Sequence, residues 1–266
     1  MSDLVRLYAH PRLKSPNMLA AWPGVGNVAA IVAAYLMSKL EFKELGEIEA
    51  SYFFDPIGIG VKDNIVEAPQ FPQSRFYYWK NKSPGSDLIL FVGDDQPVSK
   101  GYELAQCVLD MGQNFKVSRI YTCAAALTRI HPTERPRVWG VATNQSLAAE
   151  LKARNLVERG NFRIAGLNGL VLGLAKERGV DGICLLGEVP SYATRLPNPM
   201  AALAIIEVLN GMLGVKIDTQ ELAVQASVAR EKMKESAAQA MGEYIDLFTE
   251  PIWEQGMEED EGEEEE

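Results

Sequence analysis

Two glycines and an alanine near the start of the chain have the spacing of a phosphate-binding loop. Gly24, Gly26 and Ala29 fit the pattern GxGxxA, between a short apolar run and an apolar helical segment. In a dinucleotide-binding fold, this spacing lets the backbone approach a pyrophosphate at the N-terminus of a helix. The pattern therefore raises the question of whether this turn holds a nucleotide.

The residues around this loop favour a structural role over a dinucleotide site. A dinucleotide also needs an acidic residue about twenty positions later, at the end of the second strand, to hold the ribose hydroxyls. Glu47 and Glu49 fall at the start or middle of the expected strand instead, and Pro23 occupies the tight turn. We expect the glycines to permit a sharp turn from strand to helix. The helix N-terminus remains a candidate site for a small anion, formed by Gly24, Gly26 and Asn27.

Charged residues at two other turns are further candidates for a polar site. Asp94 and Asp95 follow an apolar strand, at the edge where open α/β sheets bind ligands, and paired carboxylates there could hold a metal or transfer protons. A solvated turn explains them equally well, and we favour it. His131 lies in a proline-flanked, charged loop that we expect to face water. The candidate pocket therefore comprises Gly24, Gly26, Asn27, Asp94, Asp95 and Arg135.

Several common catalytic signatures are missing from the sequence. It has no Walker A lysine, no GxSxG elbow and no HExxH motif, so we predict no cofactor and no metal and leave catalytic residues open. The three cysteines lie in apolar segments without CxxC spacing, which indicates free thiols. Nine of the last thirteen residues are acidic, and removing these nine from a net charge of −10 leaves −1. This nearly neutral body gives no support for binding nucleic acid or a membrane.

Strand-like and helix-like segments alternate through most of the chain, which is typical of an α/β domain. We predict a three-layer α/β/α sandwich with a mostly parallel central sheet, and an aromatic antiparallel excursion at residues 65–79. Strands are expected at residues 18–22, 48–54, 87–93, 118–126, 138–143 and 182–186. Helices are expected at residues 27–40, 99–115 and 144–154, and within 166–179.

The C-terminal third is predicted to be helical. A first helix follows Pro199, and Asp218 with Glu221 three residues later resembles the capped start of a long second helix. Its apolar residues form a narrow stripe that is equally compatible with a subunit contact and with docking on its own domain: Leu222, Ala226, Ala229, Met233, Ala237, Ala240, Tyr244 and Leu247. We divide the chain into a sandwich domain at 1–215, a long helix at 216–250 and a disordered acidic tail at 251–266.

Five separated motifs resemble the family named for the second proteasome assembly chaperone. They occur in that family's order between about residues 15 and 215: WPGVGNVA, VGDDQP, TRIHPTERPRVWG, GLNGLVLGLAKERGVDGICLLGEVP and SYATRLPNPMAALAIIEVL. The resemblance implies a sandwich similar to the phosphorylase/hydrolase-like folds, a homo-oligomer, and a chaperone-like role with proteasome α-subunits as partners. It supplies no agreed catalytic residues. Some proteasome-binding relatives dock by an apolar C-terminal tail, whereas this sequence ends in four glutamates, so we expect no tail docking.

The sequence thus predicts a homo-oligomeric, chaperone-like interaction protein rather than an enzyme. We expect it in the cytoplasm, because charges interrupt the N-terminal segment and the longest apolar run, residues 28–37, is too short to span a membrane. The alternative is an enzyme or sensor related to the phosphorylase/hydrolase-like folds that binds a small anion or nucleoside at the candidate pocket.

Overall fold

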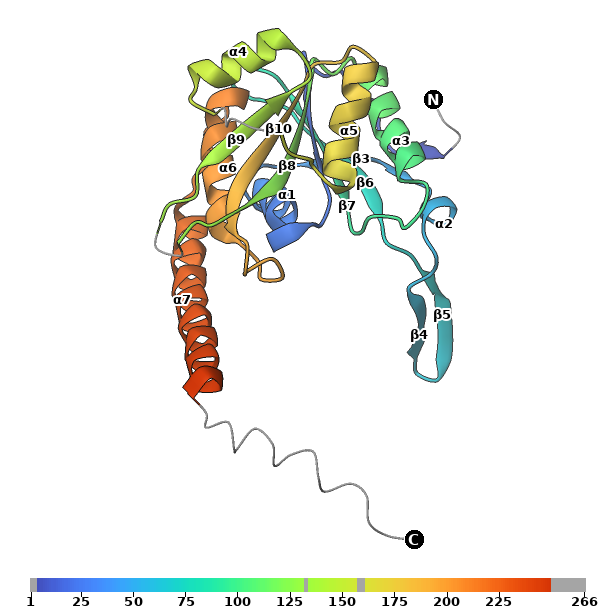
Figure 1. The fold of residues 1–266 in the computed structure, drawn as a ribbon. Coiled ribbons are helices and arrows are strands. Elements are labelled where there is room, and N and C mark those ends of the chain that lie inside the picture. The colour runs from blue at the N-terminus through green and yellow to red at the C-terminus, as the bar shows by residue number, and fades with distance from the viewer. Residues whose placement is uncertain (1–3, 132–133, 157–160, 250–266) are drawn as a thin grey trace.

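A computed structural model describes residues 4–131, 134–156 and 161–249 of the chain (Figure 1). Its main sheet contains β1 (Val5–Leu7), β2 (Asn17–Ala21), β3 (Lys43–Ile48), β6 (Ser74–Trp79), β7 (Leu88–Gly93), β8 (Arg119–Thr128), β9 (Val138–Ala142) and β10 (Gly182–Pro190). The strand order is β1-β3-β6-β7-β2-β8-β10-β9. The four strands β7, β2, β8 and β10 run parallel, and the strands on both flanks pair antiparallel.

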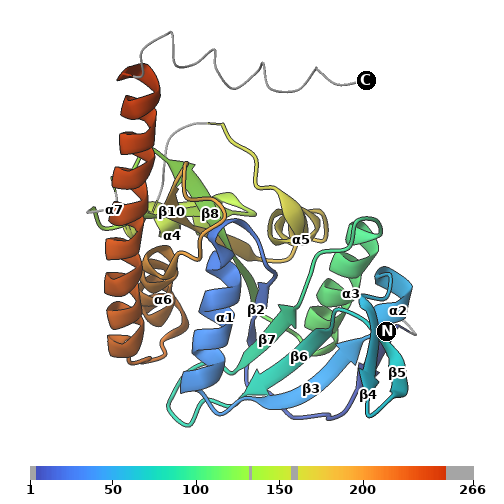
Figure 2. The same ribbon diagram turned by 90° about the horizontal axis from the view of Figure 1, so that it is seen from below.

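Helices cover both faces of this sheet, which confirms the predicted sandwich (Figure 2). One face is covered by α1 (Val28–Lys39), α4 (Gln145–Ala153) and α6 (Pro199–Leu213), and the other by α3 (Gly101–Asn114) and α5 (Gly166–Glu177). Successive strand residues point to opposite faces, so a strand covered on both sides must be apolar throughout. In β2, Leu19 packs with the α1 side, and Met18 and Ala20 pack with the α3 side.

The predicted second strand at residues 48–54 is wrong. The strand there is β3, which ends at Ile48, and residues 50–53 form the short helix α2 (Ala50–Phe53). The reason is a local cap: the Glu49 carboxylate accepts hydrogen bonds from the backbone N–H and the hydroxyl of Ser51, which favours a helical turn over further strand. The aromatic segment is antiparallel as predicted, but its second half, β6, lies inside the main sheet between β3 and β7.

The C-terminal helix α7 (Gln220–Thr249) begins where the sequence predicts, because the Asp218 carboxylate accepts a hydrogen bond from the backbone N–H of Gln220. The first half of its apolar stripe docks on the same subunit: Leu222, Ala226 and Met233 are all at most 3% exposed. The side chains of the rest of the stripe, from Ala240 onward, are not among those that the structure describes. The predicted acidic tail lies entirely outside the described residues.

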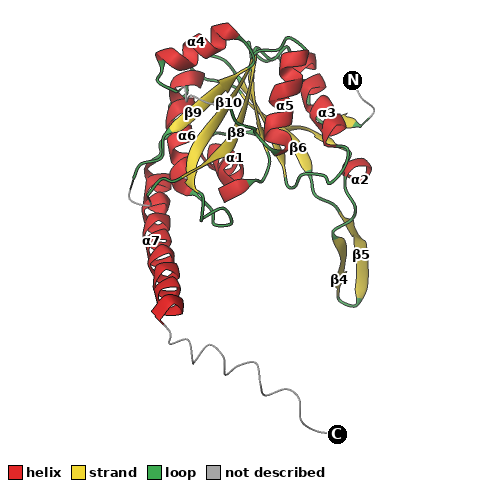
Figure 3. Ribbon diagram, viewed as in Figure 1, coloured by secondary structure: helices red, strands yellow, loops and turns green. Residues whose placement is uncertain are grey.

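Two further strands, β4 (Gly58–Lys62) and β5 (Ile65–Gln70), form a separate hairpin. The sequence analysis expected an antiparallel segment at residues 65–79 but did not predict this pairing. The hairpin and the distal half of α7 project from the same end of the body (Figure 3). That end carries the carboxyl ends of the parallel strands, where ligands bind in open α/β sheets. Among the described helices, none has the length and apolarity to cross a membrane.

Candidate functional site

The glycine loop after β2 forms a 3-10 turn, Val25–Asn27, that leads directly into α1. Gly26 has φ of 62°, in the left-handed region where glycine is favoured, and a Cβ there would lie 3.1 Å from the Cβ of Asn198. Its N–H donates to the carbonyl of Thr194 at 3.1 Å, and its carbonyl accepts from the N–H of Asn198 at 2.8 Å. Gly26 is therefore needed for the close docking of this loop on the segment that precedes α6.

The backbone donors expected to hold an anion at this turn are already engaged. The N–H of Asn27 donates to the carbonyl of Gly24 at 2.9 Å, and the N–H of Val28 donates to the carbonyl of Val25. Together with the bond from Gly26, these contacts use three consecutive donors at the start of α1. The loop is thus a structural turn, as the sequence analysis favoured, and Gly24 alone of its glycines lines a cavity.

The other three residues of the predicted pocket are engaged elsewhere: Asp94 and Asp95 adjoin in the turn after β7, and Arg135 lies in the loop before β9. Asp94 exchanges two hydrogen bonds with Gln73, at 3.0 and 2.8 Å, which closes the end of the β6–β7 ladder. The Asp95 carboxylate accepts from the N–H of Gln96 at 2.7 Å within its own turn. The Arg135 guanidinium, 76% exposed, forms an ion pair with Glu207 on α6. The structure therefore does not bring the six predicted residues into one pocket.

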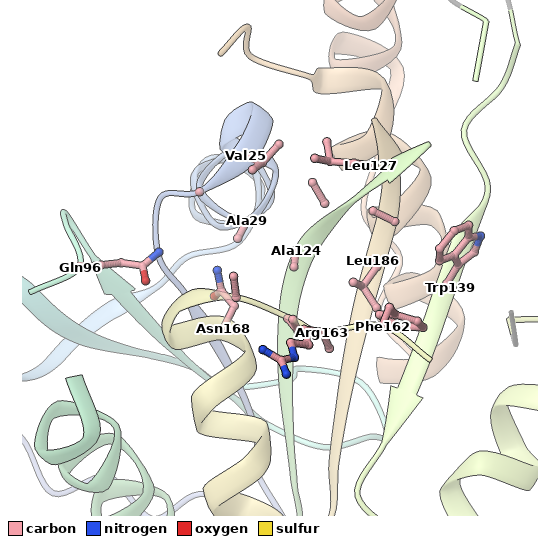
Figure 4. A pocket seen from close by; sticks show the side chains of 15 residues that line it. Val25, Ala29, Gln96, Ala124, Leu127, Trp139, Phe162, Arg163, Asn168 and Leu186 are labelled. Atoms are coloured by element: carbon pink, nitrogen blue, oxygen red, sulfur yellow. The ribbon is translucent and has the colours of Figure 1, made fainter. Parts of the chain in front are cut away.

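A cavity of about 350 Å³ does open at this end of the sheet, between β8, β10 and the start of α5 (Figure 4). We call it the apolar cavity. It is lined by Ala124, Ala125 and Ala126 of β8 and by Leu186 of β10, and also by Trp139, whose ring centroid lies 6.2 Å from that of Phe162. The remaining lining residues are Gly24, Val25, Ala29, Gln96, Leu127, Arg163, Ile164, Ala165 and Asn168.

Gln96 holds together the three segments that form one side of the apolar cavity. Its amide N–H donates to the carbonyl of Pro23 at 2.6 Å, and its amide oxygen accepts from the N–H of Leu167 at 2.8 Å. A side chain at Gly166, where φ is 74°, would collide with this amide. The turn after β7, the loop after β2 and the start of α5 are thus fixed through one side chain.

Asn168 is the buried polar group of this cavity. It is 4% exposed, and its side-chain N–H donates a long hydrogen bond of 3.5 Å to the carbonyl of Trp22. Its side-chain oxygen has no hydrogen-bond partner among the described residues, which is costly for a buried acceptor. The sequence analysis missed Gln96 and Asn168. Gln96 follows the end of β7 and Asn168 lies at the start of α5, and both belong to motifs that the sequence analysis quoted.

Beside the apolar cavity lies an open polar depression of about 660 Å³, which shares Trp139 and Phe162 with it. Charged residues of the loop expected to face water line this depression, and they are also exposed: Arg129, Glu134, Arg135 and Arg137. Glu188 of β10 is 3% exposed and accepts hydrogen bonds at 2.9 Å from both the backbone N–H and the guanidinium of Arg137. This carboxylate is thus engaged by Arg137, and the contact joins β10 to the segment before β9.

The chemistry available to the apolar cavity is binding rather than proton transfer. Its lining residues include no carboxylate, imidazole or thiol, and Arg163 is its one charged member among the described residues. Burial raises the pKa of the Cys184 thiol to about 12, and it raises the pKa of Cys123 as well. Both thiols are therefore protonated at neutral pH and are poor nucleophiles. In the described part of the chain, no cluster of three or more metal-ligating side chains occurs.

The fold and this edge of the sheet define a class of protein: an α/β/α sandwich with an apolar cavity at the carboxyl ends of its parallel strands. Residues 18–237 match the model of the PAC2 family, so the chain belongs to that family. This assignment confirms the family resemblance predicted from the five motifs.

The relatives of this chain include proteins with proteasome-related descriptions. An uncharacterized protein of Methanocaldococcus jannaschii is 28% identical over 218 residues, which are 80% of each chain. The crystal structure of PbaB of Pyrococcus furiosus, an archaeal proteasome activator, is 27% identical, covers 88% of this chain and 98% of its own, and superposes with a TM-score of 0.75. PbaA of the same organism, an archaeal homolog of proteasome-assembly chaperone, shares the fold at 23% identity and a TM-score of 0.67, over 90% of this chain and 99% of its own.

Proposed function

We propose that this chain is a cytoplasmic, homo-oligomeric, chaperone-like factor that binds proteasome α-subunits. The observation that carries the proposal is the similarity to PbaB, an archaeal proteasome activator, over nearly the whole of that protein. Membership of the PAC2 family supports the same kind of role.

The surface chemistry is consistent with protein binding. Exposed apolar side chains gather at the carboxyl edge of the sheet, where Val25, Leu127 and Phe162 are 41%, 50% and 46% exposed at the mouth of the apolar cavity. Grouped exposed apolar residues mark interaction sites on soluble proteins. The cavity offers no group suited to general acid–base catalysis, which favours a binding role at this position.

The proposal is tested by capture with proteasome α-subunits from the same organism. The purified chain is immobilised and incubated with recombinant α-subunits and with assembled core particles, and bound material is quantified. We expect stoichiometric retention of α-subunits. A variant with Leu127→Asp at the cavity mouth should lose retention, and Val98→Asp, at a fully exposed valine that does not line the cavity, should keep it. Absence of retention for the wild-type chain would contradict the proposal.

A second candidate function is binding of a small anion or nucleoside, with or without turnover. The buried Asn168 oxygen without a partner and the Arg163 cation at the same cavity favour it. Thermal-shift measurements with phosphate, nucleosides and nucleotides test it, because a ligand at one hundred times its dissociation constant adds about 2.7 kcal/mol of stability. The stabilisation should disappear in Asn168→Leu. No stabilisation by any of these compounds would count against this function.

A further inference from the structure

The β4–β5 hairpin carries large aliphatic side chains that the described protein does not cover. Ile57, Ile59, Val61 and Val66 are 60–71% exposed. An isolated two-stranded hairpin is marginally stable in water, and exposed apolar clusters mark interaction sites. This hairpin is therefore expected to gain stability from a partner.

Three of these aliphatic side chains share one face of the hairpin. Ile59 and Val61 lie two residues apart in β4 and share a face, and Val61 lies directly opposite Val66 on β5, next to a register shift of the ladder. The other face is different, because the side chains of Glu67 and Gln70 lie over Gly60 there. The face of Ile59, Val61 and Val66 is thus the more apolar one, whereas the other face carries Glu67 and Gln70 together with the exposed Ile65.

The apolar cavity is a complementary surface on the same chain. Exposed apolar side chains line its mouth, and the part of β8 that lines it consists of small alanines. An apolar cavity of about 150 Å³ already holds a benzene molecule. At about 350 Å³, the apolar cavity has room for more than one aliphatic side chain.

The net charges of the two surfaces have opposite signs, although Arg135 and Arg137 beside the cavity are already paired with Glu207 and Glu188. The hairpin segment, residues 55–70, carries three carboxylates, Asp55, Asp63 and Glu67, and one lysine. The cavity carries Arg163, and the adjoining polar depression is lined by three arginines and two glutamates. Complementary charge of this kind orients two protein surfaces and speeds their association.

We infer that the apolar face of the β4–β5 hairpin docks in the apolar cavity of a second copy of this chain. The hairpin projects away from the body of its own subunit (Figure 3), so a second copy supplies the contact. The inference rests on the self-association included in the proposed function and needs no proteasome subunit. The hairpin and the cavity then form one interface, each covering the exposed apolar side chains of the other.

Size measurements on exposed-residue variants test the inference. Ile59→Asp on the hairpin and Leu127→Asp at the cavity mouth each place a charge in the interface, and we expect each to weaken self-association by about tenfold or more. The matched control is Val228→Asp on α7, which is 54% exposed and lies on neither surface, and it should assemble like the wild type. The mass of each chain is measured by light scattering over a dilution series.

Mixing the two variants gives a sharper result. The Leu127→Asp chain keeps an intact hairpin and the Ile59→Asp chain keeps an intact cavity, so an equimolar mixture should assemble although neither variant does alone. A disulfide should also form between Ile59→Cys and Leu127→Cys chains, and not between Val228→Cys and Leu127→Cys chains. The three native cysteines are buried and should not interfere.

Two outcomes would overturn the inference. A wild-type chain that stays monomeric, or variants that assemble as well as the wild type, would exclude this interface. Capture of α-subunits is measured on the same variants. If Ile59→Asp assembles normally but no longer retains α-subunits, the inference fails and the proposed function stands, with the hairpin assigned to that partner. Loss of self-association by Ile59→Asp with retained capture supports the inference by itself, because only Leu127→Asp is expected to lose capture as well.

Discussion

The distal half of α7 and the β4–β5 hairpin project from the same end of the body (Figure 1). Apolar residues in the first half of α7 are covered by their own subunit, whereas those of the hairpin are not. Leu222 and Met233 of α7 are 0% and 2% exposed, whereas Ile59 and Val61 of the hairpin are 60% and 66% exposed. Both segments have a periodic apolar pattern. The difference teaches that periodicity identifies an apolar face but does not identify what covers it.

The start of α7 is also held by polar contacts with the end of α1. The Tyr35 hydroxyl donates to the carbonyl of Asp218 at 2.8 Å, and the ammonium of Lys39 pairs with Glu221 at 2.8 Å. The hairpin is closed at its base by the N–H of Ile57, which donates to the carbonyl of Gln70 at 2.6 Å. The contacts of Tyr35 and Lys39 hold the start of α7 on its own subunit. Variants that remove one contact at a time measure how much each contributes.

The largest expected effect is that of Leu222→Ala. Truncating this fully buried side chain should lower the free energy of unfolding by about 2–5 kcal/mol, because transfer free energy is lost and a cavity remains. The measurement is urea unfolding followed by circular dichroism. Val224→Ala, two residues away and 65% exposed, should change the value by no more than about 0.5 kcal/mol. Equal effects would mean that α7 does not dock through its apolar stripe.

A smaller loss is expected for Tyr35→Phe. The variant keeps the ring but removes the donor to the Asp218 carbonyl, so the free energy of unfolding should fall by about 0.5–1.5 kcal/mol. The same urea unfolding measures it. The control is Tyr192→Phe, whose side chain is largely exposed and should tolerate the change. An unchanged Tyr35→Phe protein would show that this bond does not anchor α7.

The Lys39–Glu221 pair should be visible in a titration more than in stability. The hydrogen bond to Glu221 and its negative charge raise the pKa of Lys39. A raised lysine pKa means that the contact contributes fully below the ordinary lysine pKa and is lost as the pH rises through the folded-state value. In Glu221→Gln, the pKa of Lys39 measured by NMR should fall toward its ordinary value. Glu231→Gln, which removes the partner of Lys234, should leave it unchanged.

The smallest effect is expected for Ile59→Ser in the hairpin. At a concentration where the subunits are dissociated, the free energy of unfolding should change by no more than about 0.5 kcal/mol, because this side chain is largely exposed within the subunit. Urea unfolding in dilute solution measures this value. A loss approaching that of Leu222→Ala would show that the hairpin packs on its own body and would remove the contrast with α7.

Much of the fold was predictable because its signals are local. The helix caps at Asn144 and Asp218 act on N–H groups two or three residues away, and the helices they begin are found where predicted. The strand predicted at residues 48–54 failed for the same kind of reason, since the cap formed by Glu49 outweighs the strand propensity of the residues after it.

The candidate site was less predictable. The sequence analysis selected Asp94, Asp95 and Arg135 by residue type, but each is engaged with a neighbour that the sequence pattern does not reveal. The cavity instead depends on Gln96 and Asn168, which lie about seventy residues apart in the chain. Gln96 bonds the carbonyl of Pro23 and the N–H of Leu167, and Asn168 bonds the carbonyl of Trp22, because the fold brings these backbone groups beside them.

The amino-acid sequence by itself determined the alternation of strands and helices, the apolar faces of those elements, the caps that begin the later helices and the family to which the chain belongs. Only the tertiary structure decided the strand order, the separation of the predicted polar residues, the docking of the first half of α7 and the uncovered face of the hairpin. The physical reason is that faces and caps arise from contacts within a few residues. Cavities and docking surfaces arise where segments far apart in the chain are packed together.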